Sequence, residues 1–442
     1  MTVKVIGAGL AGCEAAWQLA NAGIKVELCE MKPAKFTPAH KYKGFAELVC
    51  SNSLKAERIE SAAGLLKEEM RRLGSVIMLA AEATKVAAGG ALAVSREDFS
   101  DFVTEKINSH PNITVISGEV TEIPEGYVII ATGPLTGEPL SKSIQSLIGT
   151  DYLYFHDAAA PIVTAESLDS SLVFGASRYG RGEADYLNCP MDKEEYLRFY
   201  NELVSAETAP LHEFELEGSK DYKVYEGCMP IEALARRGED TMRFGPLKPV
   251  GLIDPRTGRR PYAVVQLRKE NNAGTLYNLV GFQTNLKFGE QKRVFSLIPG
   301  LENAEFVRYG VMHRNTYLNS PGLLDRHFCL KSNPRIYFAG QMTGVEGYIE
   351  SAASGIYAGL SLARRLLGLS EITLSNDTML GALAEYVEIG SPSGFQPMGS
   401  NMGILPELPE RIRNKQEKYS ALAKRALESL DRAILKGNKI CE

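Results

Sequence analysis

The sequence predicts an α/β protein in which a domain built on a parallel sheet is interrupted by an inserted mixed α+β domain. A glycine-rich turn joins a strand to a helix at the N-terminus, and a strand and helix of similar character return near residue 340. The 442 residues between and around them suffice for two or three domains of ordinary size. We expect residues 1–155 and 331–442 to form the two parts of the first domain, and residues 156–330 to form the insertion.

Composition excludes several classes of protein. The formal net charge of -5 argues against a uniformly basic nucleic-acid binder, although a local basic face is still allowed. The seven cysteines lie in no paired spacing, which is typical of reduced thiols. No stretch approaches the roughly 18–20 uninterrupted apolar residues that a membrane span needs. We therefore expect a soluble, cytoplasmic protein with no membrane partner.

The first 150 residues alternate between strand and helix patterns. The opening segment has the order strand, helix, strand of a βαβ unit. A later helix is predicted to begin at a serine and to end at a glycine. The expected elements are strands at 3–6, 24–31 and 127–131, two short strands within 113–123, and helices at 13–22 and 61–74.

The rest of the chain divides into two regions with different secondary-structure patterns. From about residue 151 to 334, strand-like pieces alternate with Gly and Pro turns, which favours antiparallel pairing. A strand followed by a long helix then resumes the alternation of strand and helix seen in the first 150 residues. The last 35 residues have a helical pattern. The expected elements are strands at 262–267, 278–282 and 335–340, and helices at 192–204 and 347–367.

The turn after the first strand has the spacing of a dinucleotide-binding signature. Gly7 permits a tight turn, Gly9 lets backbone approach a pyrophosphate, and Gly12 lets the helix pack on the strand. Glu30 closes the second strand, where a carboxylate accepts from ribose hydroxyls. This predicts a Rossmann-like site that includes Gly7, Ala8, Gly9, Leu10, Ala11, Gly12 and Glu30.

Two later segments favour FAD over NAD as the bound dinucleotide. VIIATGP at 128–134 and IYFAGQMTG at 336–344 resemble the second and third nucleotide contacts of the two-dinucleotide-binding-domain flavoproteins. The dipole of the helix that follows would stabilise negative charge on a reduced flavin. The expected contacts in these segments are Thr132, Gly133, Gly340, Gln341, Gly344, Val345 and Tyr348.

The cysteines disfavour one class of flavoprotein and leave the role of three thiols open. Cys50 is the only cysteine between Cys29 and Cys189, so it has no nearby partner in the sequence. A reactive disulfide near the flavin is therefore disfavoured. Cys50, Cys189 and Cys228 stand in unusual local sequences and are either reactive or simply buried and inert. Histidines and cysteines show no zinc spacing, so we expect no metal, and a serine hydrolase elbow is absent.

One stretch is strongly basic. Residues 236–268 carry eight basic and three acidic side chains, a net charge of +5 within a chain of -5. Its arginines near Tyr262 suit phosphate contact and base stacking, and a solvated loop with surface ion pairs is the alternative. The candidate RNA contacts are Arg236, Arg237, Arg256, Arg259 and Arg260.

Longer motifs along nearly the whole chain resemble one family. Among them are FAELVCSNS at 45–53, AAGGALAV at 87–94, EGCMPIE at 226–232, RPYAVVQLR at 260–268 and FAGQMTGVEGY at 338–348. They are similar to the folate- and FAD-dependent tRNA (uracil-5-)-methyltransferases, the TrmFO (Gid) family, which has a GidA-like fold. The motifs are long and in the same order, so the resemblance is specific.

The resemblance implies a reaction and roles for particular residues. In the family a one-carbon unit passes from 5,10-methylenetetrahydrofolate through a methylene adduct at flavin N5 to C5 of a uridine in the tRNA T-loop, with NAD(P)H as reductant. By similarity Cys228 is the nucleophile on uracil C6, and Cys50 is the second active thiol. Tyr348 either stacks on flavin or folate or simply packs at its helix start. The basic stretch becomes the preferred tRNA contact, with Arg411, Arg413 and Lys415 as weaker candidates.

Several alternatives remain open. Cys50 and Cys228 can exchange roles, because both can reach the same carbon. The same chemistry can act on a ribosomal RNA uridine, since only the RNA-facing surface would differ. A flavin oxidoreductase acting on a small molecule, or a relative of the larger wobble-uridine modifying flavoprotein, is the third possibility, although the chain length disfavours the larger relative.

Overall fold

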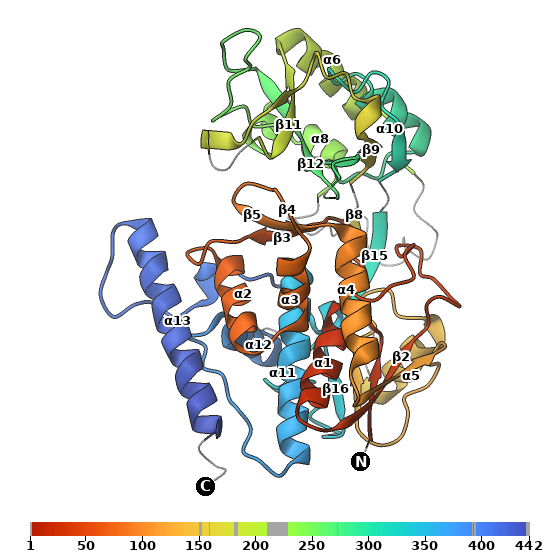
Figure 1. The fold of residues 1–442 in the computed structure, drawn as a ribbon, viewed down its shortest axis with the longest axis vertical. Helices are drawn as coiled ribbons and strands as arrows, with labels where there is room; N and C mark the ends of the chain where they lie inside the picture. Colours follow the sequence, from red (N-terminus) through yellow and green to blue (C-terminus); the bar gives the residue numbers. More distant parts are fainter. Residues whose placement is uncertain are drawn as a thin grey trace.

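A computed structural model gives the arrangement of the chain. It describes residues 2–149, 153–158, 160–180, 184–209, 229–271, 273–310, 312–390, 392 and 395–438. Figure 1 shows two parts, with the insertion lying above the domain that carries both ends of the described chain. A two-stranded antiparallel ribbon of β8 (Leu153–Ala158) and β15 (Met312–Tyr317) lies where the chain leaves the lower part and where it returns.

The lower part is built on a five-stranded parallel sheet. Its first strand lies at the centre and pairs with the second strand on one side and with a later strand on the other. The order is β16 (Ile336–Phe338), β7 (Val128–Ile130), β1 (Thr2–Ile6), β2 (Lys25–Glu30) and β6 (Ile113–Ser117). The last strand in sequence therefore completes the sheet that the first strand begins, and the predicted α/β, Rossmann-like class is confirmed.

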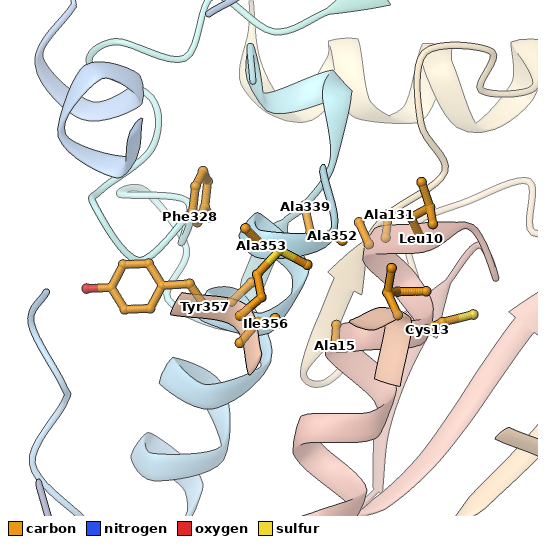
Figure 2. Packing of buried hydrophobic residues seen from close by; sticks show 14 of the residues in the cluster. Leu10, Cys13, Ala15, Ala131, Phe328, Ala339, Ala352, Ala353, Ile356 and Tyr357 are labelled. Atoms are coloured by element: carbon orange, nitrogen blue, oxygen red, sulfur yellow. The ribbon is translucent and has the colours of Figure 1, made fainter. Parts of the chain in front are cut away.

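Helices from both ends of the chain pack around this sheet. They are α1 (Leu10–Asn21), α2 (Ala62–Arg72), α3 (Val76–Ala83), α4 (Arg96–Ser109), α5 (Glu138–Ile148), α11 (Tyr348–Leu366), α12 (Met379–Ile389) and α13 (Lys415–Asn438). Small apolar side chains of α1 and α11 meet at their crossing, among them Ala15 and Ala352 (Figure 2). A Cβ on Gly355 would lie 2.1 Å from the carbonyl oxygen of Ala11, and one on Gly359 would lie 2.8 Å from that of Ala15. Only glycine therefore permits this close approach of two helices.

A small sheet lies between the two parts of the molecule. It contains β3 (Ser53–Ala56), β5 (Ala91–Val94) and β4 (Lys85–Val86), in that order. The side chain of Lys67 is buried beneath it and donates to the carbonyls of Leu54 and Ala56, both at 2.7 Å. These bonds fix the segment that follows Cys50 in the sequence.

The insertion has an antiparallel sheet and its own core. The strand order is β10 (Phe174–Gly175), β11 (Tyr186–Met191), β12 (Ala263–Lys269), β13 (Leu276–Leu279), β9 (Ile162–Thr164) and β14 (Phe306–Arg308). Its helices are α6 (Lys193–Ser205), α8 (Ile231–Arg236), α9 (Thr241–Phe244) and α10 (Phe288–Phe295). Aromatic side chains fill this core, with Phe282 in contact with Phe199 and Phe295. The insertion therefore has a mixed α+β architecture with a separate hydrophobic core.

Some expected elements differ from the structure. Residues 113–123 hold one strand, β6, rather than two, because the chain turns away at Gly118, whose φ is +141°. The strand expected at 278–282 ends at Leu279, and Gly281 follows with φ +79°. Helix α1 begins three residues earlier than expected, directly after the N-cap Gly9. Helices α3, α4, α5 and α12 were not expected from the sequence, nor were α8, α9 and α10 of the insertion.

Replacing Gly355 by alanine tests the crossing of α1 and α11. The added Cβ would collide with backbone, which cannot move aside as a flexible side chain can. We expect the free energy of unfolding to fall by about 2 kcal/mol or more. Gly289→Ala on α10 is the matched control, because its Cβ would meet nothing within 4 Å and alanine favours a helix over glycine. Equal stability of the two variants in denaturant unfolding would contradict this account.

Candidate active site

One cavity collects most of the predicted site residues. It has a volume of about 460 Å³ and opens at the carboxyl ends of β1, β2, β7 and β16, where the parallel sheet meets the N-termini of α1 and α11. This is the edge at which open α/β sheets bind ligands. The predicted residues that line it are Gly7, Ala8, Gly9, Leu10, Ala11, Glu30, Cys50, Thr132, Gly133, Gly340, Gln341 and Tyr348.

The three glycines of the first turn have different surroundings. Gly7 has φ +97°, and a Cβ there would lie 2.7 Å from the carbonyl oxygen of Ala131. A Cβ on Gly12 would lie 1.8 Å from the carbonyl oxygen of Gly7, so Gly12 serves packing and does not line the cavity. A Cβ on Gly9 would meet nothing within 4 Å. Space is therefore left beside Gly9 and the N-terminus of α1, where a pyrophosphate would bind.

Glu30 stands at the end of β2 with its carboxylate held by backbone. One oxygen accepts from the N–H of Ala8 at 2.7 Å, and the other accepts from the N–H of Lys32 at 2.9 Å. The side chain is only 7% exposed, yet it lines the cavity. These bonds orient the carboxylate and leave lone pairs for ribose hydroxyls.

The start of α11 forms another wall. Gly340 and Gly347 have φ of +83° and +119°, which turn the backbone toward the cavity. Lys55, which sequence analysis missed, lines the cavity here and lies 2.8 Å from Oε1 of the buried Glu350. The other oxygen, Oε2, is buried and has no hydrogen-bond partner among the described residues. The ammonium of Lys55 and the N-terminus of α11 thus meet at one end of the cavity, with the buried Glu350 behind them.

Two predicted residues of that segment do not line the cavity. A Cβ on Gly344 would lie 2.4 Å from the ring of Phe395, so Gly344 packs against the segment at residues 395–398. Val345 is buried and forms a bridge with Met398 in the same segment. Both residues therefore pack behind the cavity wall and do not face the cavity.

Cys50 lines the cavity in contact with Tyr348. Its N–H donates to the tyrosine hydroxyl at 2.7 Å, and its Sγ lies 2.9 Å from the same oxygen. The N–H of Ser51 also points at that oxygen, at 3.3 Å. Because Tyr348 Oη accepts from backbone, its own proton is directed to Cys50 Sγ. The hydroxyl of Tyr348 therefore donates a hydrogen bond to the thiol of Cys50. Neither ring stacking nor packing at the helix start, the two roles expected from the sequence, includes this contact.

Burial raises the pKa of Tyr348 well above its ordinary value, and the neighbouring Cys50 adds to the rise. Tyr348 therefore keeps its proton at neutral pH and remains a hydrogen-bond donor to the sulfur. A thiolate that accepts such a bond is stabilised relative to one in apolar surroundings.

Four other described cysteines are less suited to chemistry. Burial raises the pKa of each thiol, and each side chain is at most 8% exposed. They are Cys13, Cys29, Cys189 and Cys329. Cys189 was a candidate on its local sequence, but it lies on β11 inside the insertion core. Cys228 lies outside the described residues, as does the rest of residues 210–228.

The segment around Cys50 is held by Arg268, which the sequence indicated only as part of the basic stretch, and by Arg96, which it did not indicate. The guanidinium of Arg268 donates to Asn52 Oδ1 at 2.9 Å and to Ser51 Oγ at 2.8 Å. Arg96 donates to the carbonyl of Leu48 and pairs with Glu270 at 3.0 Å. Residues on both sides of Cys50 are therefore anchored. The contacts themselves join three separate stretches of sequence, so no local pattern predicts them.

The basic stretch divides into exposed and structural arginines. Arg268 is 6% exposed and points to the Cys50 segment, so it does not belong to a basic surface. Arg243 lies over the ring of Tyr262 at 3.5 Å, which covers a face that we expected for base stacking. Arg256 pairs with Asp254 at 3.0 Å. Exposed side chains remain at Arg236, Arg237, Arg256, Arg259 and Arg260, and at Arg411, Arg413 and Lys415 before and at the start of α13.

Two features are absent from the part of the chain that the structure describes. Within it, no group of three or more His, Cys, Asp or Glu side chains is arranged to hold a metal ion. No described helix combines the length and the apolar character that crossing a membrane requires.

Comparison with known proteins assigns the family. The model of the family described as glucose inhibited division protein A matches residues 2–370. A protein of Acetivibrio thermocellus is 60% identical over 435 residues, which cover 98% of this chain and 99% of the relative. One of Bacillus licheniformis is 60% identical over 429 residues, covering 97% and 98%. Both are named methylenetetrahydrofolate–tRNA-(uracil-5-)-methyltransferase TrmFO. The chain belongs to the TrmFO family.

Solved structures agree with the fold of this TrmFO family member. Aquifex aeolicus GidA in its form I crystal has a TM-score of 0.67 at 16% identity, covering 97% of this chain and 76% of that chain. The form II crystal gives 0.65 at the same identity, with 98% and 76% covered. At this identity the likeness shows the GidA-like fold and nothing about substrate.

Alanine at Gly9 and at Gly12 separates binding from packing in the glycine turn. We expect Gly9→Ala to leave the melting temperature of the cofactor-free protein within about 2 °C, because its Cβ meets no atom. The methyl group would enter the space for the pyrophosphate, so FAD affinity should fall about tenfold or more, roughly 1.4 kcal/mol.

Gly12→Ala should instead lower the free energy of unfolding by about 1–3 kcal/mol, because its Cβ overlaps the carbonyl of Gly7. Thermal melting and FAD titration followed by fluorescence measure both effects. If Gly9→Ala bound FAD as tightly as the native chain, the pyrophosphate would not lie beside Gly9.

Proposed function

We propose that this protein methylates C5 of a uridine in the T-loop of tRNA with a one-carbon unit from 5,10-methylenetetrahydrofolate, FAD and NAD(P)H. It is an enzyme of the methylenetetrahydrofolate–tRNA-(uracil-5-)-methyltransferase type. The observation that carries this is 60% identity over 98% of the chain to a relative of that name, together with a dinucleotide cavity that has a thiol in its wall. We place the protein in the cytoplasm, where tRNA is modified.

FAD fits the residues of the cavity. Gly9 leaves open space at the N-terminus of α1, Glu30 offers a fixed carboxylate, and the start of α11 offers a helix N-terminus beside Lys55. FAD bound there would supply the reducing equivalents, taken from NAD(P)H, and would carry the one-carbon unit between the folate and the uracil. The protein binds and orients the cofactor through Gly7, Ala8, Leu10 and Ala11, Thr132 and Gly133, and Gly340 and Gln341.

The thiols supply the covalent and proton-transfer steps. Uracil C5 is a poor nucleophile until a thiolate adds to C6, which leaves electron density on C5. Cys228 is the thiol that adds, by similarity to the family. Once C5 has bonded to the one-carbon unit, Cys50 accepts the proton that leaves C5, and the C6–S bond then breaks, which releases the Cys228 thiolate and restores the C5=C6 double bond. Tyr348 Oη, 2.9 Å from Cys50 Sγ, keeps its own proton and stabilises the Cys50 thiolate by a hydrogen bond before that transfer.

The exposed arginines of the insertion contact the tRNA backbone. Arg259 and Arg260 make no ion pair with any residue that the structure describes, and both are exposed. A guanidinium without an internal partner is suited to phosphate. Arg236, Arg237 and Arg256 extend the same basic stretch, whereas Arg411, Arg413 and Lys415 are secondary contacts.

A single assay separates this function from its alternatives. Protein is incubated with methylene-labelled tetrahydrofolate, NAD(P)H and either a tRNA transcript or a ribosomal RNA transcript. We expect label in the tRNA alone, and none when the T-loop uridine is replaced by cytidine. Label in ribosomal RNA alone would reassign the substrate. Label in neither, from protein that is yellow with bound FAD and oxidises NAD(P)H, would indicate an oxidoreductase.

Cysteine variants test the two thiols. We expect Cys50→Ala and Cys228→Ala each to lower the rate of methyl incorporation by about a hundredfold or more, while FAD remains bound. Cys329→Ala is the control, because Cys329 is buried away from the cavity and should leave the rate within about twofold. A native rate in Cys50→Ala would remove this thiol from the chemistry.

A further inference from the structure

The end of β12 reaches out of the insertion to the segment that carries Cys50. Arg268 and Glu270 both contact residues of the lower part, on either side of the thiol. The neighbouring carbonyl of Lys269 accepts from the side chain of Asn52 at 2.8 Å. Arg268 and Lys269 therefore contact Ser51 and Asn52 directly, 216 and 217 positions away in the sequence, whereas Glu270 reaches Leu48 through Arg96.

Arg268 joins this segment from the side of Ser51 and Asn52. Its two donors engage Asn52 Oδ1 and Ser51 Oγ, at 2.9 and 2.8 Å. Asn52 is fully buried and also donates to the carbonyl of Val94 at 3.0 Å. Every polar atom of the Asn52 side chain is thus hydrogen-bonded, so the side chain is held in one orientation and Arg268 is bonded to a fixed partner.

Glu270 acts from the side of Leu48 through Arg96. Both carboxylate oxygens face the guanidinium, at 3.0 and 3.2 Å, and the two side chains are 4% and 14% exposed. Arg96 donates its remaining nitrogen to the carbonyl of Leu48. Burial lowers the pKa of Arg96, and Glu270, Tyr348 and Cys50 raise it more, so the guanidinium stays charged beside the thiol.

We propose that Arg268 and Glu270 are positioning residues through which the insertion sets the place and reactivity of Cys50. The inference rests on the role of Cys50 given under the proposed function. Tyr348 comes from α11 of the lower part, whereas the Cys50 segment is anchored to β12 of the insertion. The 2.9 Å contact between Cys50 Sγ and Tyr348 Oη is therefore fixed from both parts of the molecule.

The alternative is that Arg268 belongs to the RNA-binding stretch in which it lies. Its burial argues against this, since 94% of the side chain is covered while its donors are used within the protein. An RNA contact and a positioning residue differ in kinetics. Loss of the first raises KM for tRNA, and loss of the second lowers kcat.

The test compares Arg268→Met with Arg259→Ala and with Arg293→Met. Arg293 is an exposed arginine on α10 that pairs with Glu290 at 2.8 Å, so it controls for loss of an arginine in the insertion. The reagent is iodoacetamide on FAD-loaded protein, with the rate at Cys50 measured by peptide mass spectrometry. In Arg268→Met we expect Cys50 to react at least fivefold faster, because its segment is released and its half-buried thiol becomes accessible. Arg293→Met should react at the native rate.

The same variants are then assayed for methyl transfer. We expect kcat of Arg268→Met to fall at least tenfold with KM for tRNA within threefold, whereas Arg259→Ala should raise KM and leave kcat nearly unchanged. Alkylation of Cys50 at the native rate in Arg268→Met, or a raised KM with native kcat, would overturn the proposal. Because alkylation needs no substrate, it decides the matter even if no RNA is methylated.

A milder variant covers the case in which Arg268→Met does not fold. Ser51→Ala removes one acceptor of Arg268 and leaves the other in place, so the guanidinium remains bonded. Thermal melting and the flavin absorbance spectrum establish that the fold is kept. Cys50 alkylation should then rise at least twofold, and a native rate in folded Ser51→Ala would count against the proposal.

Discussion

Helices α1 and α11 cross so closely that only glycine fits at the contact, and both cofactor-binding segments of the cavity depend on that crossing. Gly355 and Gly359 face backbone carbonyls of α1, and the Cβ of Ala11 lies against Gly340 in the turn before α11. The crossing therefore sets where the two helix N-termini lie relative to each other. Since one would receive a pyrophosphate and the other a flavin, the spacing of the crossing fixes the length of ligand that the cavity accepts.

The domain joint is a second constraint, and it is polar rather than apolar. Arg268, Glu270 and Asn52 form a network in which buried charges are paired and buried amides are satisfied. An apolar joint would tolerate sliding, whereas hydrogen bonds of fixed direction do not. The insertion is thus held in a single orientation against the segment that carries Cys50.

The predicted elements that agreed with the structure were those with strong local signals. The glycine turn, the parallel strands around it, helix α6 with its Asp192 cap and the long helix α11 all follow from spacing within one window. The errors occurred where tertiary contacts supply the stabilising interactions. The local N-caps of α3 and α12 are Ser75 and Thr378, and further N–H groups of their first turns are bonded by the buried Glu14 and Glu69 of other helices. These carboxylate contacts are not visible in the local sequence.

The sequence alone determined the dinucleotide signature, the candidate thiol Cys50 and the family, because each is written in consecutive residues. Only the tertiary structure decided which arginines of the basic stretch face solvent and that Tyr348 meets Cys50 across 298 positions. The reason is physical. A periodic pattern fixes which face of an element is buried, but the partner of a buried polar group depends on how separate elements pack. Arg268 shows the difference, since its neighbours in sequence suggest an RNA contact, whereas its neighbours in space are Ser51 and Asn52, beside Cys50.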